Sequence, residues 1–370
     1  MTSNLRVALG ERSYDILVGQ HVLGNGAGDA IARVIKSKSV IIVSDEHVAR
    51  FYLHRLSNAL EEQQIRSRSI IVKAGEASKS YSAFADLMEN ILEQKPDRNT
   101  TLIALGGGVV GDLTGFAASV CLRGLDFIQI PTSLLAQVDS SVGGKTGINS
   151  KFGKNLIGSF HQPILVIADV ETLATLPARE LMSGYAEIVK YGLINDPPLF
   201  TWLEKNAVEM LSGKRELVTE AVVASCNAKA AIVAADEKEQ GQRALLNFGH
   251  TFAHAFEAET GFSQSLLHGE AVAIGMILAF QASVKMGLCD KVDYARVKAH
   301  YEATGLPLSP QYVQKEWNID ALMEHFTRDK KAKDGALTFV LTHGIGKAFV
   351  ANNVDNSVIR ETLVEACRGV

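Results

Sequence analysis

The sequence has few cysteines, no strong excess of one charge and no long apolar segment, and each absence excludes a class of protein. The four cysteines among 370 residues are widely scattered, without the close spacing of a thiolate metal site or a redox motif. The formal net charge is −4, so no overall basic field attracts nucleic acid or an anionic membrane. Any anionic substrate must therefore meet a local cluster of lysine and arginine.

Export and membrane signals are also missing. The N-terminus has no apolar signal-peptide core. The longest apolar stretch, Ala271–Phe280, is interrupted by Gly275 and is shorter than the roughly 18–20 residues that span a bilayer. These features predict a cytoplasmic protein with reduced thiols and with neither nucleic-acid nor membrane partners.

The composition, with 47% hydrophobic and 21% charged residues, indicates a globular protein of roughly two domains. In the first half, β-branched apolar runs are typical of a parallel sheet covered on both faces. Between them, residues 82–93 have helical spacing, which gives a βαβ rhythm. The runs predicted as buried strands are 39–43, 69–72, 101–105, 126–130 and 164–167.

Beyond about residue 176 the pattern becomes helical and stays so to about residue 286. A late β-branched pair, 337–340 and 347–350, predicts a small hairpin. We therefore predict an α/β domain over residues 1–176 and a mainly α-helical domain over residues 177–370.

A glycine-rich turn, Gly106–Gly108, follows one predicted strand and precedes a helical pattern over residues 109–120. Glycines there let the backbone approach a pyrophosphate, to which the helix N-terminus presents its N–H groups. The order is not G-x-G-x-x-G, and the turn equally suits a plain strand-to-helix connection. Polar loops at 74–79 and 131–133 favour a ligand at the same sheet edge, where Asp45 could hold a ribose hydroxyl.

Three separate segments offer metal ligands. His250 and His254 are four residues apart, so they share one helical face. His268 opens the next helix, and Glu187 lies on a third, largely apolar helix. The two imidazoles of the first pair could bind one metal together, or one could bind it while the other hydrogen-bonds the substrate. Either could instead be a solvated or core histidine. A glutamate with two imidazoles leaves coordination positions open, as catalytic zinc does, and Thr251 replaces the glutamate of the H-E-x-x-H protease motif.

Several cations lie beside these motifs, and any one of them could be a solvated surface charge. Lys190 stands out because it is three residues from Glu187 on an apolar helix, and Lys145 because paired glycines precede it. Together such cations would bind a substrate that bears a phosphate and a carboxylate. The candidates are Arg123, Lys145, Lys154, Lys190, Lys229, Arg243 and Lys330.

These residues closely resemble the 3-dehydroquinate synthase family, over nearly the whole chain. The motifs that carry the resemblance are Gly106–Asp112 (GGGVVGD), Pro131–Thr146 (PTSLLAQVDSSVGGKT), Gly153–Phe160 (GKNLIGSF), Gly184–Gly192 (GYAEIVKYG), Leu245–Thr251 (LLNFGHT) and His268–Val272 (HGEAV).

The resemblance implies a Rossmann-like NAD-binding α/β domain, a C-terminal helical metal domain and a cleft between them, usually in a homodimer. It implies conversion of 3-deoxy-D-arabino-heptulosonate 7-phosphate to 3-dehydroquinate and phosphate, in the shikimate pathway of aromatic amino-acid biosynthesis. NAD would be used catalytically, with Zn²⁺ or Co²⁺. The implied steps are oxidation of a hydroxyl, phosphate elimination, reduction, and ring opening followed by intramolecular aldol closure. The protein would mainly orient the substrate and exclude water.

The resemblance also implies site residues, position by position. The metal ligands would be Glu187, His250 and His268. The substrate and catalytic residues would be Arg123 (from the neighbouring subunit), Asp139, Lys145, Asn155, Lys190, Lys229, Arg243, Asn247, His254 and Lys330. Of these, Lys190 and Lys229 would hold the carboxylate or other polar groups, and His254 would join a proton relay with Asp139. The NAD contacts would be Asp45, Glu76, Lys79, Gly107, Gly108, Val109, Asp112, Thr132, Ser133, Lys145, Lys154, Thr172 and Thr175.

Two small departures concern cofactor contacts: Ser133 stands where a second threonine is common, and His47 where asparagine is common. Related cyclases acting on sedoheptulose 7-phosphate or glucose 6-phosphate are the nearest rival. They alter the carboxylate pocket, whereas Lys190 and Arg243 here are of the dehydroquinate type. Metal-dependent alcohol dehydrogenases lack the Gly-Gly-Lys-Thr segment, and a metal-stabilised binding protein would leave the cation cluster without a purpose.

Overall fold

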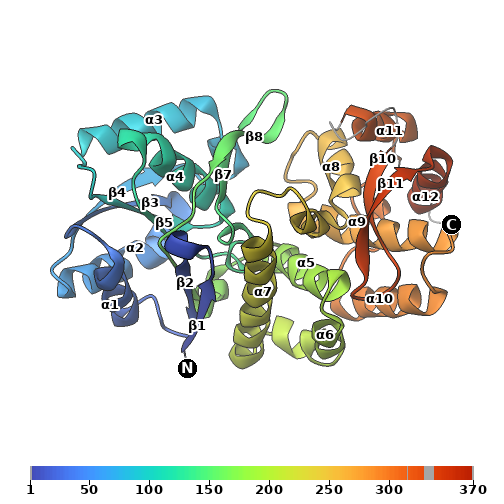
Figure 1. The fold of residues 1–370 in the computed structure, drawn as a ribbon, viewed down its shortest axis with the longest axis horizontal. Helices are drawn as coiled ribbons and strands as arrows, with labels where there is room; N and C mark the ends of the chain where they lie inside the picture. The colour runs from blue at the N-terminus through green and yellow to red at the C-terminus, as the bar shows by residue number, and fades with distance from the viewer. Residues whose placement is uncertain (1, 315, 329–336, 369–370) are drawn as a thin grey trace. The chain divides into compact units, whose positions relative to one another are not determined.

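The computed structural model describes residues 2–314, 316–328 and 337–368 (Figure 1). By its internal contacts the chain divides into two compact units. The first unit comprises Met1–Pro177 and Arg215–Lys238, and the second comprises Ala178–Lys214 and Glu239–Val370.

A seven-stranded sheet forms the centre of the first unit, in the order β1-β2-β9-β6-β5-β3-β4. Strand β1 pairs antiparallel with β2, and the other neighbours run parallel. The five predicted strands are present as β3, β4, β5, β6 and β9, whereas β1 and β2 were not predicted. The bounds are β1 Thr2–Val7, β2 Tyr14–Gly19, β3 Ser39–Asp45, β4 Arg66–Val72, β5 Thr101–Gly106, β6 Phe127–Pro131 and β9 Leu165–Asp169.

Helices cover both faces of this sheet, as the continuous apolar runs predicted. Successive side chains of β3 enter opposite cores: Val40 and Ile42 pack with Leu56 of α2, whereas Ile41 and Val43 pack with Leu87 of α3. Helix α1 belongs to the first of these cores and α4 to the second. The bounds are α1 Asn25–Val34, α2 Glu46–Glu62, α3 Tyr81–Glu93 and α4 Gly108–Val120.

Strand β4 corrects one sequence-based expectation. Residues 69–72 were predicted as a buried strand, but β4 lies at the edge of the sheet, where Ile70 is buried and Ile71 is 47% exposed. An edge strand has a neighbour on one side only, so part of its apolar surface remains in solvent.

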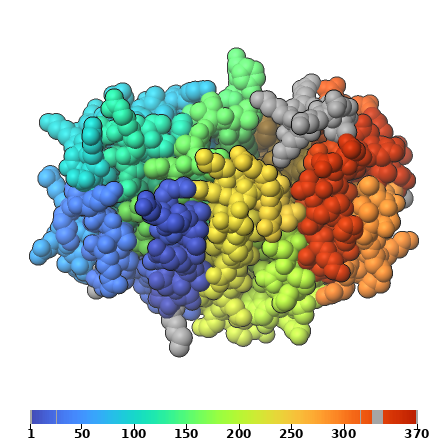
Figure 2. Space-filling view, in the orientation of Figure 1, coloured from blue at the N-terminus to red at the C-terminus, as the bar shows by residue number. Residues whose placement is uncertain are grey.

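A hairpin that the sequence analysis did not predict follows the sheet. Strands β7 (Lys145–Ser150) and β8 (Gly153–Phe160) pair antiparallel and project from the rest of their unit (Figures 1 and 2). Gly158 permits this pairing, because a Cβ there would lie 2.0 Å from the carbonyl oxygen of Thr146.

Helix α7 (Arg215–Ala235) belongs to the first unit, although the sequence predicted a single boundary at residue 176. The reason is packing: α7 contacts β1, β2 and the short helix η4 (Ala136–Ser140). Among the residues described, α7 is also the one helix long and apolar enough to cross a membrane, but half of its apolar window is buried within the protein.

The second unit is mainly helical, with α9 at its centre. Nearly every residue from Gly269 to Ser283 is buried, as expected for a helix that is apolar on all sides, and α9 contacts α5, α8, α10, α12 and β10. The predicted late hairpin is present as β10 and β11. The bounds are α5 Ala178–Ile194, α6 Pro197–Leu211, α8 His250–Glu259, α9 His268–Lys285, α10 Lys291–Thr304, α11 Ile319–Arg328, α12 Asn356–Arg368, β10 Leu337–Thr342 and β11 Ala348–Val354.

Candidate functional site

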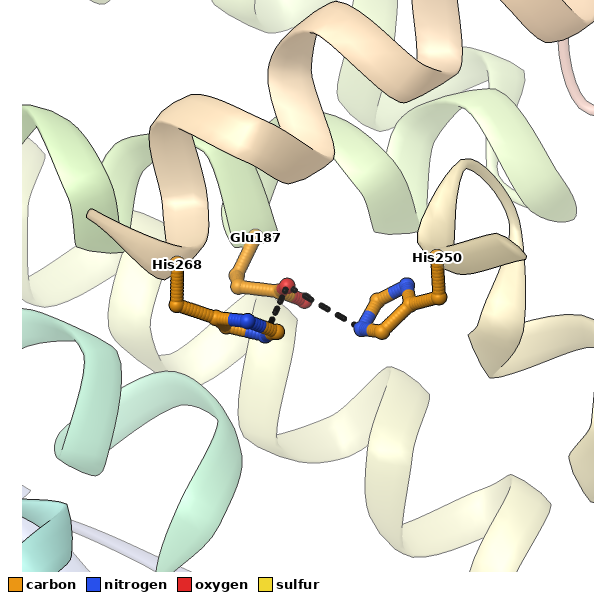
Figure 3. A group of neighbouring side chains, drawn as sticks. All are labelled: Glu187, His250 and His268. Atoms are coloured by element: carbon orange, nitrogen blue, oxygen red, sulfur yellow. Dashed lines mark ion pairs between the residues drawn. The ribbon is translucent and has the colours of Figure 1, made fainter. Parts of the chain in front are cut away.

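Glu187, His250 and His268 come together in the second unit from three helices. Glu187 lies within α5, His250 is the first residue of α8, and His268 is the first residue of α9. Their nearest ligand atoms all lie within 4.8 Å of one another. Oε1 of Glu187 is 3.7 Å from Nε2 of His250 and 3.9 Å from Nε2 of His268, and both imidazole rings turn toward this carboxylate (Figure 3). This is a chelating geometry for one divalent ion.

Glycines allow these helices to approach closely. A Cβ on Gly269 would lie 1.9 Å from the carbonyl oxygen of Ser183, on the turn of α5 before Glu187. A Cβ on Gly275 would lie 2.0 Å from the carbonyl oxygen of Gly249, which itself has a φ of +80° and is the N-cap residue of α8. Small residues at these crossings therefore fix the three ligand-bearing segments against one another.

The buried carboxylate of Glu187 is suited to binding a cation. The side chain of Glu187 is fully buried. Its Oε2 forms an ion pair with the ammonium of Lys190, whereas within the described part of the chain its Oε1 accepts no hydrogen bond. A buried carboxylate oxygen without a partner is costly, so a divalent ion would satisfy the oxygen of Glu187 that faces the two imidazoles.

The state of His250 also suits metal binding. Its pKa is lowered well below the usual value, first by burial and then by the charges of Lys190, His268 and His254. A neutral imidazole keeps a lone pair for a metal. Nδ1 of His250 lies 3.2 Å from the carbonyl oxygen of Phe248, so Nε2 is the nitrogen directed at Glu187.

His254 has a different environment from the three grouped residues. It is exposed, with its ring centroid 5.7 Å from that of His250 and 6.5 Å from that of His268. It therefore borders the site and lies outside the chelating group.

Arg179 and Glu270 hold the segment before His268, and the sequence analysis missed both roles. Arg179, in the first turn of α5, binds both carboxylate oxygens of Glu270 at 2.6 and 2.7 Å and donates to the carbonyl oxygens of Gln264 and Ser265. The carboxylate of Glu270 accepts from the backbone N–H of Leu267. A glutamate at the third helical position is a capping signal, which was the available clue.

Two further predicted cations lie deep in the second unit. Lys190 and Arg243 are each only 1% exposed. Asn247 donates to Oε1 of Glu239 at 2.8 Å. Lys330 lies outside the described residues. Buried cations of this kind are suited to a desolvated anionic ligand.

In the first unit, four predicted residues form one network around Lys79. Its buried ammonium donates to Asp112 at 2.6 Å and to Asn155, and lies 4.0 Å from Glu76. Burial raises the pKa of Asp112, and this effect outweighs the lowering by Lys79. The network joins the loop after β4, the first turns of α4 and the hairpin β7–β8.

A second pair in the first unit joins Lys229 and Asp139. The buried ammonium of Lys229 donates to the backbone carbonyl of Asp139 at 2.6 Å and to its carboxylate at 2.8 Å. Lys229 lies on α7, so the inserted helix brings a functional candidate into the first unit.

The glycine-rich turn lies where the sequence predicted it. Gly106 ends β5, Gly107 precedes α4 and Gly108 begins it. A Cβ on Gly108 would lie 3.0 Å from Oγ of Ser140, and one on Gly107 would lie 3.4 Å from Oγ of Ser133. An added Cβ would be tight at Gly108 and in ordinary contact at Gly107, so packing alone does not distinguish a phosphate-binding turn from a plain strand-to-helix connection.

The remaining cofactor candidates are found around the same ends of the parallel strands. Asp45 caps α2 by accepting from the backbone N–H groups of His47 and Val48. Thr172 and Thr175 both contact the hydroxyl of Tyr52. The buried Thr132 and the half-buried Ser133, Val109 and Lys154 also belong to the first unit, together with the exposed Lys145 and Arg123.

Comparisons with known proteins agree with this geometry. The family models described as 3-dehydroquinate synthase N-terminal and 3-dehydroquinate synthase C-terminal match residues 69–183 and 184–332. The 3-dehydroquinate synthase of Caulobacter vibrioides is 52% identical over 367 residues, which cover 99% of both chains.

Two solved structures share the fold. The 2-epi-5-epi-valiolone synthase of Streptomyces hygroscopicus, with NAD⁺ and Zn²⁺ bound, is 29% identical, with a TM-score of 0.87 and coverage of 98% of this chain and 99% of that one. A 2-deoxy-scyllo-inosose synthase complexed with carbaglucose-6-phosphate, NAD⁺ and Co²⁺ is 25% identical, with a TM-score of 0.86 and coverage of 98% and 100%. By its sequence, its fold and its cluster of Glu187, His250 and His268, the chain belongs to the 3-dehydroquinate synthase family.

Proposed function

We propose that this chain converts 3-deoxy-D-arabino-heptulosonate 7-phosphate to 3-dehydroquinate and phosphate, as an NAD- and metal-dependent lyase of the shikimate pathway. The observation that carries the proposal is the chelating cluster of Glu187, His250 and His268 beside the buried Lys190, in a chain of this family. Such a cluster combines metal chemistry with recognition of an anion.

The cofactors would supply the redox and Lewis-acid chemistry. Bound NAD⁺ would accept a hydride from a substrate hydroxyl carbon and return it later, and Zn²⁺ or Co²⁺ held by Glu187, His250 and His268 would polarise the substrate oxygen. With three protein ligands, the site keeps positions open for substrate oxygens.

The residues of the second unit would recognise and orient the substrate. Lys190 and Arg243 would pair with its carboxylate, because a desolvated carboxylate binds well only beside a cation. Asn247 would hold a hydroxyl, and His254 would exchange a proton at the exposed border of the site.

The first unit would be the NAD-binding domain. The N-terminus of α4, with Gly107, Gly108 and Val109, would face the pyrophosphate. Asp45 would use its second carboxylate oxygen on a ribose hydroxyl while the first continues to cap α2. The other proposed NAD contacts are Glu76, Lys79, Asp112, Thr132, Ser133, Lys145, Lys154, Thr172 and Thr175.

Other residues of the first unit would serve the substrate. Asp139, which is ion-paired with Lys229, would take part in proton transfer. Lys145 and Asn155 would bind substrate oxygens. Arg123, exposed after α4, would serve the substrate phosphate of a second subunit in a homodimer. We place this enzyme in the cytoplasm.

One assay tests the reaction. Purified protein is given the heptulosonate phosphate with NAD⁺ at well below the substrate concentration, and phosphate and the absorbance of NADH are followed together. We expect many equivalents of phosphate per NAD⁺, with no lasting NADH. Removal of metal by a chelator should stop phosphate release, and Zn²⁺ or Co²⁺ should restore it.

Each alternative gives a different result in the same assay. Stoichiometric NADH would indicate a dehydrogenase. Equal turnover of sedoheptulose 7-phosphate would indicate a cyclase with another substrate. Full activity in metal-free protein would contradict the role proposed for Glu187, His250 and His268.

A further inference from the structure

We infer that Glu257 is a positioning residue that fixes the tautomer of His268, so that the lone pair of Nε2 is directed at the metal site. Glu257 lies near the end of α8 and is not among the three chelating residues. The inference rests on the proposed function, because it concerns the same metal site.

The geometry places the two nitrogens of His268 in different environments. Nδ1 lies 3.4 Å from Oε1 of Glu257, whereas Nε2 lies 3.9 Å from Oε1 of Glu187. One edge of the ring thus faces the chelating cluster and the other faces a second carboxylate.

The burial of Glu257 argues for a defined role. Its side chain is 1% exposed, whereas His268 is 32% exposed. A carboxylate is costly to bury, and it remains in a protein interior when it pairs with a polar or charged group. The contact of 3.4 Å with His268 is a weak hydrogen bond by distance, and its value to the site lies in the direction it gives to the imidazole.

His250 provides an internal comparison. Its Nδ1 lies 3.2 Å from the carbonyl oxygen of Phe248, and its Nε2 also faces Glu187. Both imidazoles therefore have an oxygen acceptor at Nδ1 and direct Nε2 at the same carboxylate. In one case the acceptor is the backbone, and in the other it is the side chain of Glu257.

Helical spacing explains how α8 serves both imidazoles. Glu257 follows His250 by seven residues, which is close to two turns of an α-helix, so both side chains lie on one face. Helix α8 packs against α9, whose first residue is His268. A single helix face therefore supplies one chelating group and the acceptor for another.

The chemical consequence follows from the two forms of neutral imidazole. In water the form with its proton on Nε2 predominates, and that form presents its lone pair at Nδ1, away from Glu187. An acceptor at Nδ1 favours the proton there and leaves the Nε2 lone pair for the ion. Acceptors of this kind orient metal-bound histidines, and their loss typically weakens metal affinity about 10- to 100-fold.

The test uses the full-length protein and the variant Glu257→Leu, which keeps a side chain of similar size but removes the acceptor. Zn²⁺ affinity is measured by competition with a chromophoric chelator. The tautomer of His268 is read from ¹⁵N chemical shifts of the ten labelled histidines in metal-free protein, and the signal is assigned with His268→Gln. We expect the Nδ1–H form in the unmodified protein, and a loss of this preference together with at least about tenfold weaker Zn²⁺ binding in Glu257→Leu.

Glu259→Leu is the matched control. Glu259 lies two residues further along α8 and pairs with Nε2 of His325 at 2.7 Å, so this change removes another carboxylate–histidine contact from the same helix. It should leave both Zn²⁺ affinity and the His268 signal unchanged.

The results separate this inference from the proposed function. If the unmodified protein binds no Zn²⁺, the proposed function fails, while the spectrum of the metal-free protein still reports on Glu257. An Nε2–H form of His268 in the unmodified protein overturns the inference without any variant. Unchanged affinity or an unchanged tautomer in Glu257→Leu overturns it as well.

Discussion

Lys190 is buried beside Glu187, and its proposed partner in the working enzyme is the substrate carboxylate. Sedoheptulose 7-phosphate carries a hydroxymethyl group where the heptulosonate carries this carboxylate. Lys190→Met should therefore lower kcat/KM for the heptulosonate phosphate far more than for the neutral sugar. Loss of one partner from a buried ion pair costs about 3–5 kcal/mol, so we expect the ratio of the two kcat/KM values to change by at least about a hundredfold.

The neutral sugar is the internal control in this experiment. If Lys190→Met also perturbs Glu187, the turnover of both substrates falls. That common loss cancels in the ratio of the two kcat/KM values. An equal loss on both sugars would mean that Lys190 serves Glu187 alone.

His300 should make the stability of the protein depend on pH. This residue of α10 is 5% exposed, its Nε2 lies 2.6 Å from the hydroxyl of Tyr185, and burial lowers its pKa to about 4. Because the unfolded chain has the usual histidine pKa of about 6.5, it binds more protons than the folded state between about pH 6.5 and pH 4. The contribution of the neutral, buried His300 to the free energy of unfolding is fully present above about pH 6.5. It is lost as the pH falls through this window.

From about pH 7.5 to pH 5, this group alone should lower the free energy of unfolding by about 2 kcal/mol. His300→Gln retains an acceptor for Tyr185 but does not titrate, so its loss over the same interval should be smaller by that amount. Urea unfolding at the two pH values measures the free energy of unfolding of both proteins. An equal loss in the unmodified protein and in His300→Gln would show that His300 does not cause this pH dependence.

At the residue scale, the sequence predicted the chelating group better than its surroundings. Glu187, His250 and His268 were recognisable because their residue types bind metals and their segments are apolar. The roles of Arg179 and Glu257 were not, because a charged residue on a helix is usually solvated and only the packing of α5, α8 and α9 shows which carboxylates face an imidazole. The chemical roles of all these residues remain predictions.

At the scale of elements, the crossing of α8 and α9 depends on Gly275. An added Cβ would lie 2.0 Å from the carbonyl oxygen of Gly249, so Gly275→Ala must displace the first turn of α8, which carries His250. We expect a loss of about 1–3 kcal/mol in the free energy of unfolding, measured with urea, together with weaker Zn²⁺ binding.

Gly26→Ala is the matched control for this substitution. Gly26 also lies in a helix, α1, but its added Cβ would lie 3.8 Å from the nearest atom, on Val22. Alanine there should be neutral or stabilising, by up to about 1 kcal/mol. Equal stability of the two variants would show that the crossing adapts without cost.

Strands were predictable where both faces are buried and less so elsewhere. The apolar runs of β3, β5, β6 and β9 identify central strands, and β4 gave a similar run although it lies at an edge. Strands β1 and β2 were missed because their polar and apolar residues mix, as in Thr2–Val7, where the exposure alternates. The hairpin β7–β8 was missed because its glycines, required by close pairing, resemble those of a loop.

At the scale of the whole molecule, α7 should be essential to the first unit. Its buried residues include Val218, Val222 and Val233, and the helix packs on β1 and β2. A fragment of residues 1–177 would expose this surface of the sheet, so we expect it to aggregate. The same fragment joined by a flexible linker to residues 215–238 should be soluble and monodisperse in size-exclusion chromatography. Equal solubility of the two fragments would show that α7 is dispensable.

The path of the chain through its two units also limits how related genes can exchange parts. The chain passes from one unit to the other three times, after residues 177, 214 and 238. Homologous recombination at a single point would therefore join strands from one parent to an α7 from the other, unless that point lies beyond residue 238. Three coordinated crossovers are needed to transfer the first unit without the α5 and α6 segment. The gene segment for residues 1–238 should therefore be inherited as one block. The two parts of the first unit should diverge together, along with the α5 and α6 segment that lies between them in the sequence.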